Sequence, residues 1–226
     1  MTSKDPLLPI PLINFIRQNS SYSRREILNK IINGHVKINE NVICDSKIMV
    51  LPTDRVCVDQ LKIVANRKLY YKFNKPIDVI STFHDPNQRH DLMTYLKKSR
   101  LPDTLKPIGR LDRQSSGLLL FSNDGDFIQT VLHPQFLVSK EYEIVLNRPL
   151  KATDQTKLEH GFFLDDGPVK IQFKDSFSKT QFLVSIHMGR NRILRRSFDY
   201  FGYTITTLHR TAIGRIELGN LKKRRV

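Results

Sequence analysis

An uninterrupted apolar run at Leu118–Phe121 (LLLF) constrains the fold more than any other short stretch of this chain. A strand with one face in water alternates polar and apolar residues, whereas this run has no polar face. The turn-forming residues SNDGD follow it directly. The run therefore predicts a central strand that is covered on both faces.

The residues from Leu69 onward mix strand and helix patterns without a strict strand–helix–strand order. Such a mixture predicts an α+β fold with a largely antiparallel sheet. Further strands are predicted at 69–76, 79–83, 140–146, 169–173, 181–188 and 204–218, and helices at 92–98, 126–134, 153–161 and 191–202.

The first 60 residues predict a separate small α/β domain. Ser23 and Glu26 have the spacing of a capping box, which starts a helix at Arg24. The alternating VKI, the turn NEN and the alternating RVCVD then predict short strands. The polar and basic stretch QLKIVANRK separates this domain from the next. We therefore predict a domain at 8–60, a linker at 61–68 and a second, larger domain at 69–226.

The charge of the chain favours a polyanionic partner. Lysine and arginine number 37 and aspartate and glutamate 22, which gives a net charge of +15. Nucleic acid is the first candidate for this partner and an anionic membrane surface the second. The alternative that the excess of basic residues only aids solubility remains open. Arg192, Arg195 and Arg196 are three and four residues apart on a predicted helix, so we expect them to share one face and form a phosphate track.

Other classes of function lack their motifs. Cys44 and Cys57 have neither disulfide nor zinc spacing, and no segment resembles a secretory signal or a membrane span. We expect a cytoplasmic protein, with an organelle left open. The sequence has no Walker or dinucleotide-binding loop and no hydrolase elbow. Asp124 and Asp126 fit a turn and a helix cap better than a magnesium site. No metal and no cofactor are therefore expected.

The stretch before the apolar run holds one carboxylate, Asp112, between Arg110 and Arg113. From the residues alone, a structural salt bridge and a functional acid are both open. The stretch GRLDRQSSGLLLFSNDGD, however, resembles the catalytic motif of pseudouridine synthases of the RsuA-type family, which act on ribosomal RNA. KEYEIVL and MGRNRILRRSFDYFGYTITTLHRTAIGRIELGNL resemble later motifs of that family in order and spacing. The N-terminal region resembles the alpha-L RNA-binding domain of a ribosomal protein, which is typical of this branch.

The resemblance implies isomerisation of uridine to pseudouridine and a role for several residues. Asp112 corresponds to the catalytic aspartate, and Arg195 to the arginine that favours its ionised form. Tyr142 corresponds to the tyrosine that stacks on the uracil, and Leu194 to an apolar residue that packs against it. Arg110 is expected to shape the loop or contact a phosphate.

The partner implied by the resemblance is ribosomal RNA. Arg24 and Arg25 in the first domain, and Arg190 and Arg192 in the second, are expected to bind its backbone, which helps the target base leave its stack. The SRRE and GRNR stretches favour large-subunit over small-subunit RNA, and a monomer is expected. Ile193 stands where the family usually has glutamine, and Met188 where it has glutamate. A non-catalytic rRNA-binding or ribosome assembly factor on the same fold remains the alternative.

Overall fold

A computed structural model describes residues 9–51, 53–81, 91–99 and 101–222 of the chain. The chain forms two compact units. Unit 1 comprises the residues up to Tyr70 together with Pro102–Lys106 and Ser122–Gly125. Unit 2 comprises Tyr71–Leu101, Pro107–Phe121 and Asp126–Val226. Each unit is described by itself below.

Unit 1 packs two helices on a small antiparallel sheet of strand order β3-β2-β5-β6, and a further short pair joins β1 to β4. The predicted start of the second helix is confirmed, because Ser23 and Glu26 form both hydrogen bonds of the capping box. The elements in chain order are β1 (Ile10–Pro11), α1 (Leu12–Asn19), α2 (Arg24–Ile32), β2 (Val36–Ile38), β3 (Asn41–Val42), β4 (Met49–Val50), β5 (Val56–Val58) and β6 (Leu61–Ile63).

The core of unit 1 follows from the spacing of its apolar residues. Leu12 and Ile16 are one helical turn apart on α1, and Ile27 and Ile31 have the same spacing on α2. All four side chains are fully buried in one cluster, together with residues of β2 and β5. The helices thus cover the apolar face of the sheet, as amphipathic helices do.

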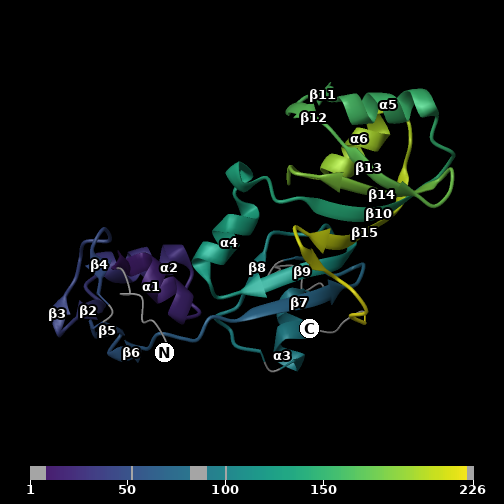
Figure 1. Ribbon diagram of the computed structural model, residues 1–226. Coiled ribbons are helices and arrows are strands. Elements are labelled where there is room, and N and C mark those ends of the chain that lie inside the picture. Colours follow the sequence, from purple (N-terminus) through teal and green to yellow (C-terminus); the bar gives the residue numbers. More distant parts are fainter. Residues whose placement is uncertain (1–8, 52, 82–90, 100, 223–226) are drawn as a thin grey trace, which may run out of the picture. The chain divides into compact units, whose positions relative to one another are not determined.

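Unit 2 is built on one large mixed sheet, and Figure 1 shows its strands with the helices around them. Its elements, a few of which extend into unit 1 at one end, are β7 (Tyr70–Lys75), α3 (Leu92–Lys98), β8 (Lys106–Ile108), β9 (Ser116–Ser122), α4 (Gly125–Leu132), the short 3-10 helix η1 (Pro134–Phe136), β10 (Lys140–Leu146), α5 (Ala152–His160), β11 (Phe162–Leu164), β12 (Gly167–Val169), β13 (Gln172–Ser176), β14 (Gln181–Ile186), α6 (Ile193–Tyr200), β15 (Ile205–Ile213) and β16 (Ile216–Glu217).

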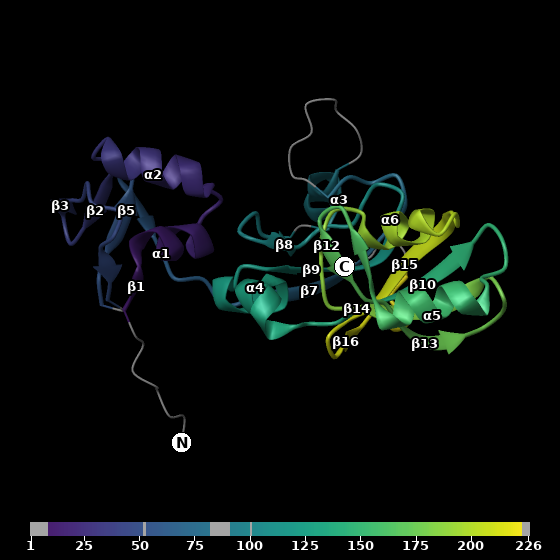
Figure 2. The ribbon, with the colours of Figure 1, turned by 90° about the horizontal axis from the view of Figure 1, so that it is seen from above.

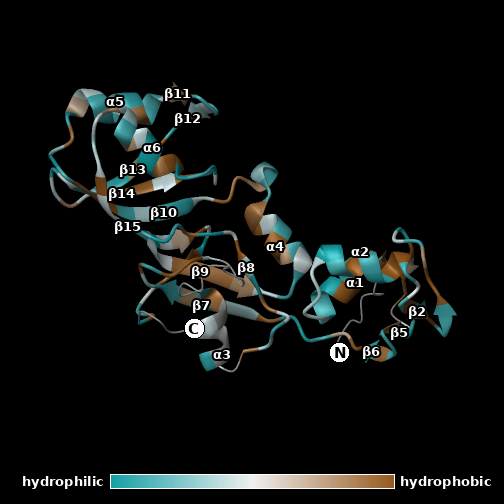
Figure 3. Cartoon of the chain, turned by 180° about the vertical axis from the view of Figure 1, so that it is seen from behind, coloured by the Kyte–Doolittle hydropathy of each residue, from teal (hydrophilic) through white to brown (hydrophobic). Residues whose placement is uncertain are grey.

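The strand order of the large sheet is β13-β14-β10-β15-β9-β7, with β16 paired to β15 and β8 to β9. The pairs β13–β14, β14–β10 and β10–β15 are antiparallel, whereas β15 and β9 run parallel. All seven residues of β9 are buried, and Figure 3 shows the strand as mainly hydrophobic. The predicted α+β class and the predicted central strand at Leu118–Phe121 are both confirmed.

Helices cover parts of this sheet. Helix α5 lies beside β13 and α6 beside β15 (Figure 1, Figure 2). Helix α3 packs on β7 through an aromatic pair, in which the ring centroids of Phe73 and Tyr95 are 5.4 Å apart. The apolar strand β9 therefore lies in the interior of unit 2, and the loops that connect the strands can form a site.

Several elements differ from the sequence prediction. The expected strand at 79–83 is wrong for 79–81, where Ile80 forms only an isolated bridge, and 82–83 lie outside the described residues. The expected strand at 169–173 is interrupted, because β12 ends at Val169 and β13 begins at Gln172. The hairpin of β11 and β12 was not predicted. Leu61–Ile63, assigned to the linker, forms β6 and pairs with β5.

Candidate active site

A cleft of about 740 Å³ opens in unit 2. Its lining comes from the loop before β9, from β10 and β15, and from the segment that leads into α6. Asp112 is the one carboxylate among the described residues that line it. The basic side chains of the lining are Arg110, Lys140, Arg190, Arg192 and Arg210, joined by His133 and His187. The cleft is thus a positively charged cavity around a single acid.

The loop that carries Asp112 is held by residues that follow β7. The Ser81 hydroxyl donates to the carbonyl of Leu111 at 2.6 Å and accepts from the amide of Leu111 at 3.0 Å. The backbone amide of Asp78 donates to the carbonyl of Arg113, and the Arg113 side chain pairs with the Asp78 carboxylate at 3.1 Å. Asp112 is therefore fixed from both sides, while its own side chain keeps 35% exposure toward the cleft.

The ion-pair partner of Asp112 is Arg192, whose Nη1 lies 4.0 Å from Oδ2 of Asp112. The resemblance to the family implied that Arg195 is the arginine that acts on Asp112. Arg192 precedes α6 in the left-handed conformation, with φ of 47°, which is uncommon for a residue other than glycine. Because Arg192 lies outside the helix, it does not share a helical face with Arg195 and Arg196, so the shared face expected from their spacing is wrong.

Arg195 instead lies under the cleft wall. The residue is 8% exposed, and its guanidinium donates to the carbonyls of Ile205 at 2.7 Å and Gln114 at 3.1 Å. Burial lowers the pKa of Arg195, the charge of Arg192 lowers it further, and the charges of Asp112 and Asp199 oppose this. Arg195 is thus electrostatically coupled to Asp112, and it holds the Asp112 loop through the Gln114 carbonyl.

Tyr142 and Arg210 meet across neighbouring strands. They are register partners on β10 and β15, and both line the cleft. Arg210 lies 5.9 Å from the centroid of the Tyr142 ring, and its Nη1 donates to the Tyr142 hydroxyl at 3.4 Å. Its Nε donates to the carbonyl of Leu118 on β9 at 2.7 Å. Arg210 therefore joins the tyrosine strand to the strand that follows Asp112.

Sequence reasoning missed three cations in or near this site: the buried Lys75 and Arg210, and the half-buried Lys140. A usable signal existed in β15, where Arg210 alternates in phase with the buried Leu208 and Ala212. Lys75 is fully buried and donates to the carbonyls of Pro76 at 2.9 Å and Ser115 at 2.8 Å. Burial lowers the pKa of Lys140, and the charge of Arg210 adds to this effect.

The burial of Lys75 predicts a pH-dependent stability. Burial lowers the pKa of Lys75 from 10.5 to about 8, although Asp112 and Asp78 favour its charged form. The folded protein releases this proton at a lower pH than the unfolded chain, so stability rises between pH 8 and pH 10.5. Relative to Lys75→Met, wild type should gain about 3 kcal/mol over that window in urea unfolding. Parallel pH profiles of the two proteins would contradict this expectation.

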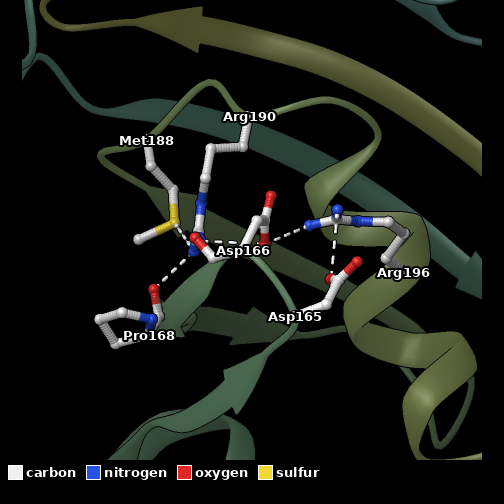
Figure 4. A network of polar contacts seen from close by, with 6 residues as sticks. All are labelled: Asp165, Asp166, Pro168, Met188, Arg190 and Arg196. Atoms are coloured by element: carbon white, nitrogen blue, oxygen red, sulfur yellow. Dashed lines mark hydrogen bonds and ion pairs between the residues drawn. The ribbon is translucent and has the colours of Figure 1, made fainter.

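An acidic hairpin holds the segment that leads into α6, as Figure 4 shows. Asp166, in the turn between β11 and β12, accepts from Arg190 at 3.0 Å and from Arg196 at 2.6 Å. Asp165 lies 3.6 Å from Arg196. The carbonyls of Asp166 and Pro168 also accept from Arg190, and the Met188 sulfur lies 3.3 Å from its Nη2. Arg190 is therefore fixed at the cleft edge by the hairpin.

The shared carboxylate of Asp166 predicts a modest effect on stability. Asp166→Asn removes one negative charge from two arginines that are each about a quarter exposed, which should cost about 1 kcal/mol and lower the thermal midpoint by roughly 2–4 °C. Asp165→Asn is the matched control, because Asp165 is 84% exposed and makes one longer contact. Equal losses in the two variants would show that Asp166 does not hold the segment.

The remaining predicted site residues are placed as follows. Arg110 and Leu194 both line the cleft, Arg110 exposed and Leu194 buried. Arg24 and Arg25 lie exposed in the first turn of α2 in unit 1.

The aspartates after β9 have structural contacts. Asp124 is buried and pairs with Lys68 at 3.0 Å and with the Tyr70 hydroxyl at 2.7 Å. Helix α4 starts at Gly125, so Asp126 lies in its first turn and is not the cap that was expected. Within the described ranges, no group of three His, Cys, Asp or Glu residues could hold a metal ion.

Comparison with known proteins identifies the class. The family described as RNA pseudouridylate synthase matches residues 70–200. Ribosomal large subunit pseudouridine synthase B of Bacillus subtilis is 33% identical over 88% of this chain and 83% of its own length. An uncharacterized RNA pseudouridine synthase of Aquifex aeolicus is 29% identical over 95% of this chain and 88% of its own length.

A solved pseudouridylate synthase supports the fold. Its crystal structure matches with a TM-score of 0.67 at 21% identity and covers 96% of this chain and 94% of its own. The chain therefore belongs to the RNA pseudouridylate synthase family. It is a pseudouridine synthase, an isomerase. None of the helices in the described part of the chain is long and apolar enough to cross a membrane.

Proposed function

We propose that this protein isomerises a specific uridine of ribosomal RNA, with the large subunit favoured, and that Asp112 is the catalytic aspartate. The observation that carries the proposal is the position of Asp112, the one acidic side chain among the described residues of a cleft lined by basic groups. The name of the Bacillus subtilis relative, which specifies the large ribosomal subunit, supports the choice of substrate.

The proposed reaction is an isomerisation of one nucleoside, so its atomic composition does not change. The bond between C1′ and N1 breaks, the uracil turns, and a new bond joins C1′ to C5. The proton on C5 is lost, and N1 gains one. A carboxylate beside the sugar and the base serves as the nucleophile for this exchange, with the positive charges of Arg192 and Arg195 nearby.

The cleft offers the target base a defined position. Tyr142 presents a ring on one wall, and Leu194 adds an apolar side chain from α6. In this proposal the uracil stacks on Tyr142 and packs against Leu194. Leaving the RNA stack costs about a few kcal/mol, which contacts to the backbone offset. Arg110 at the cleft edge is suited to contact a phosphate, because it is exposed and basic.

Unit 1 is proposed to supply further RNA contacts. The side chains of Arg24 and Arg25, in the first turn of α2, form no hydrogen bond or ion pair with the described part of the chain. Two cations at that end of a helix oppose its dipole, and a bound phosphate relieves this. Helix α2 is therefore the part of unit 1 that we assign to RNA binding.

Pseudouridine mapping of ribosomal RNA tests the proposal. The RNA is probed by carbodiimide modification and primer extension in cells that lack the gene and in cells that carry wild type or Asp112→Ala. We expect one uridine to lose its mark on deletion and to regain it with wild type alone. If each mark survives deletion, or if Asp112→Ala restores the mark, the proposed role fails. The non-catalytic assembly factor then becomes the better hypothesis.

A further inference from the structure

Arg210 is a buried cation without a carboxylate partner in the part of the chain that the structure describes. It is 2% exposed, and its contacts are to the Leu118 carbonyl, the Tyr142 hydroxyl and the Tyr142 ring. Its Nη2 is buried and has no hydrogen-bond partner within the described ranges of the chain. A buried charged donor without a hydrogen-bond partner costs folding free energy. Such a group in a cleft therefore indicates a ligand that accepts its hydrogen bond.

Among the contacts given for the described residues, none joins Arg210 to a carboxylate. Lys75 and Lys140 lie close enough for the positive charge of Arg210 to lower the pKa of both. The Ser115 hydroxyl is a second buried group on the cleft wall that has no hydrogen-bond partner among the described residues. The cleft floor thus holds surplus hydrogen-bond donors and positive charge, which suits an oxygen that gains negative charge.

Such an oxygen arises in the proposed reaction, on which this inference rests. When the bond between C1′ and N1 breaks with its electrons on the base, the negative charge spreads from N1 to the carbonyl oxygens O2 and O4. When a carboxylate adds to C6 of the base instead, the charge moves to O4. Either course places negative charge on a carbonyl oxygen of the uracil before C5 joins C1′.

We infer that Arg210 is a further catalytic residue, whose Nη2 donates to a carbonyl oxygen of the uracil and stabilises the charge that develops there. The base that stacks on Tyr142 lies against the ring that Arg210 already contacts at 5.9 Å. The contacts to Leu118 and Tyr142 hold the guanidinium in place before the substrate binds. Arg210 transfers no proton in this role.

The test compares substrates in which sulfur replaces one carbonyl oxygen of the target uridine. Sulfur accepts a hydrogen bond less well than oxygen. RNA fragments with uridine, 2-thiouridine or 4-thiouridine are used at saturation in single-turnover reactions of wild type, Arg210→Lys and Arg210→Met. We expect Arg210→Met to slow the uridine reaction by about 10²- to 10³-fold and Arg210→Lys to recover part of that loss.

The decisive result is the sulfur effect. For wild type, the reaction rate with one of the two thio-substituted RNAs should be about tenfold or more below the rate with the uridine RNA. For Arg210→Met, the rates with that thio-substituted RNA and with the uridine RNA should be equal. Arg215→Met, which removes an exposed arginine from the turn after β15, should keep the wild-type sulfur effect. An Arg210 that is merely structural would alter the unfolding midpoint and leave the sulfur effect in place, which would overturn the inference.

Two controls keep the inference separate from the proposed function. If Arg210→Met does not fold, the comparison of wild type with Arg210→Lys decides, because lysine keeps the charge and changes the donor geometry. If wild type forms no pseudouridine in the RNA, the proposed function itself fails. If wild type is active and Asp112→Asn is not, an unchanged sulfur effect in the Arg210 variants overturns only the role of Arg210.

Discussion

Asp112→Asn should abolish pseudouridine formation while leaving the fold and RNA binding intact. The amide has nearly the same shape as the carboxylate but is a poor nucleophile and carries no charge for Arg192. We expect the single-turnover rate to fall at least about ten-thousand-fold. The rate is measured by the release of tritium from C5 of the target uridine, because the reaction removes the hydrogen at C5. RNA affinity is measured in parallel by filter binding.

Asp78→Asn is a suitable matched control for this experiment. It alters a carboxylate that pairs with Arg113 on the same loop, where both side chains are more than half exposed. It should reduce the rate far less than Asp112→Asn, since exposed pairs contribute about 0–1 kcal/mol. A measurable rate for Asp112→Asn within about tenfold of wild type would rule out nucleophilic attack by Asp112.

Gly117→Ala should destabilise unit 2 by about 3–5 kcal/mol, with a fall of roughly 10 °C in its thermal midpoint. A Cβ at Gly117 would lie 2.2 Å from the carbonyl oxygen and 2.6 Å from the amide nitrogen of Arg210. Both are backbone atoms of the neighbouring parallel strand, so neither can move without separating β9 from β15. Gly117 also has φ of +103°, which alanine rarely adopts.

Gly189→Ala is the control for this stability measurement. A Cβ at Gly189 meets no atom of the described residues within 4 Å, so the unfolding midpoint should change little. Both variants are followed by circular dichroism and by differential scanning calorimetry. A Gly117→Ala protein that unfolds like wild type would mean that β9 and β15 do not approach as closely as the structure has them.

Local patterns were sufficient to predict most elements of the fold. The capping box at Ser23 and Glu26, the alternation in KEYEIVL and the apolar run at Leu118–Phe121 each depend on neighbours in the sequence, and each prediction is confirmed. The pairing of β9 with β15 joins residues 93 positions apart, such as Ser116 and His209, and no local pattern specifies it. The hairpin of β11 and β12 was missed because its strands have only three residues each.

Site residues that belong to a sequence motif could be predicted, whereas site residues whose position depends on tertiary packing could not. Asp112 and Tyr142 were found through the resemblance, and the structure brings both to one cleft. The partner of Asp112 depends on where α6 begins, since a helix that starts at Ile193 leaves Arg192 outside and turns Arg195 inward. Lys75 and Arg210 were missed because charged residues within strands are normally assigned to the exposed face.

The parallel contact between β9 and β15 also sets the order in which the protein acquires its site during synthesis. The Asp112 loop and β9 leave the ribosome well before Arg210 does, and β9 then lacks its inner neighbour. Contacts of such long sequence separation form late, because the chain loses much entropy before it gains them. The apolar strand is thus exposed for the time needed to add about 90 residues, roughly 5–20 s. A nascent chain that includes β9 but not yet β15 should therefore depend on chaperones more than the finished protein does.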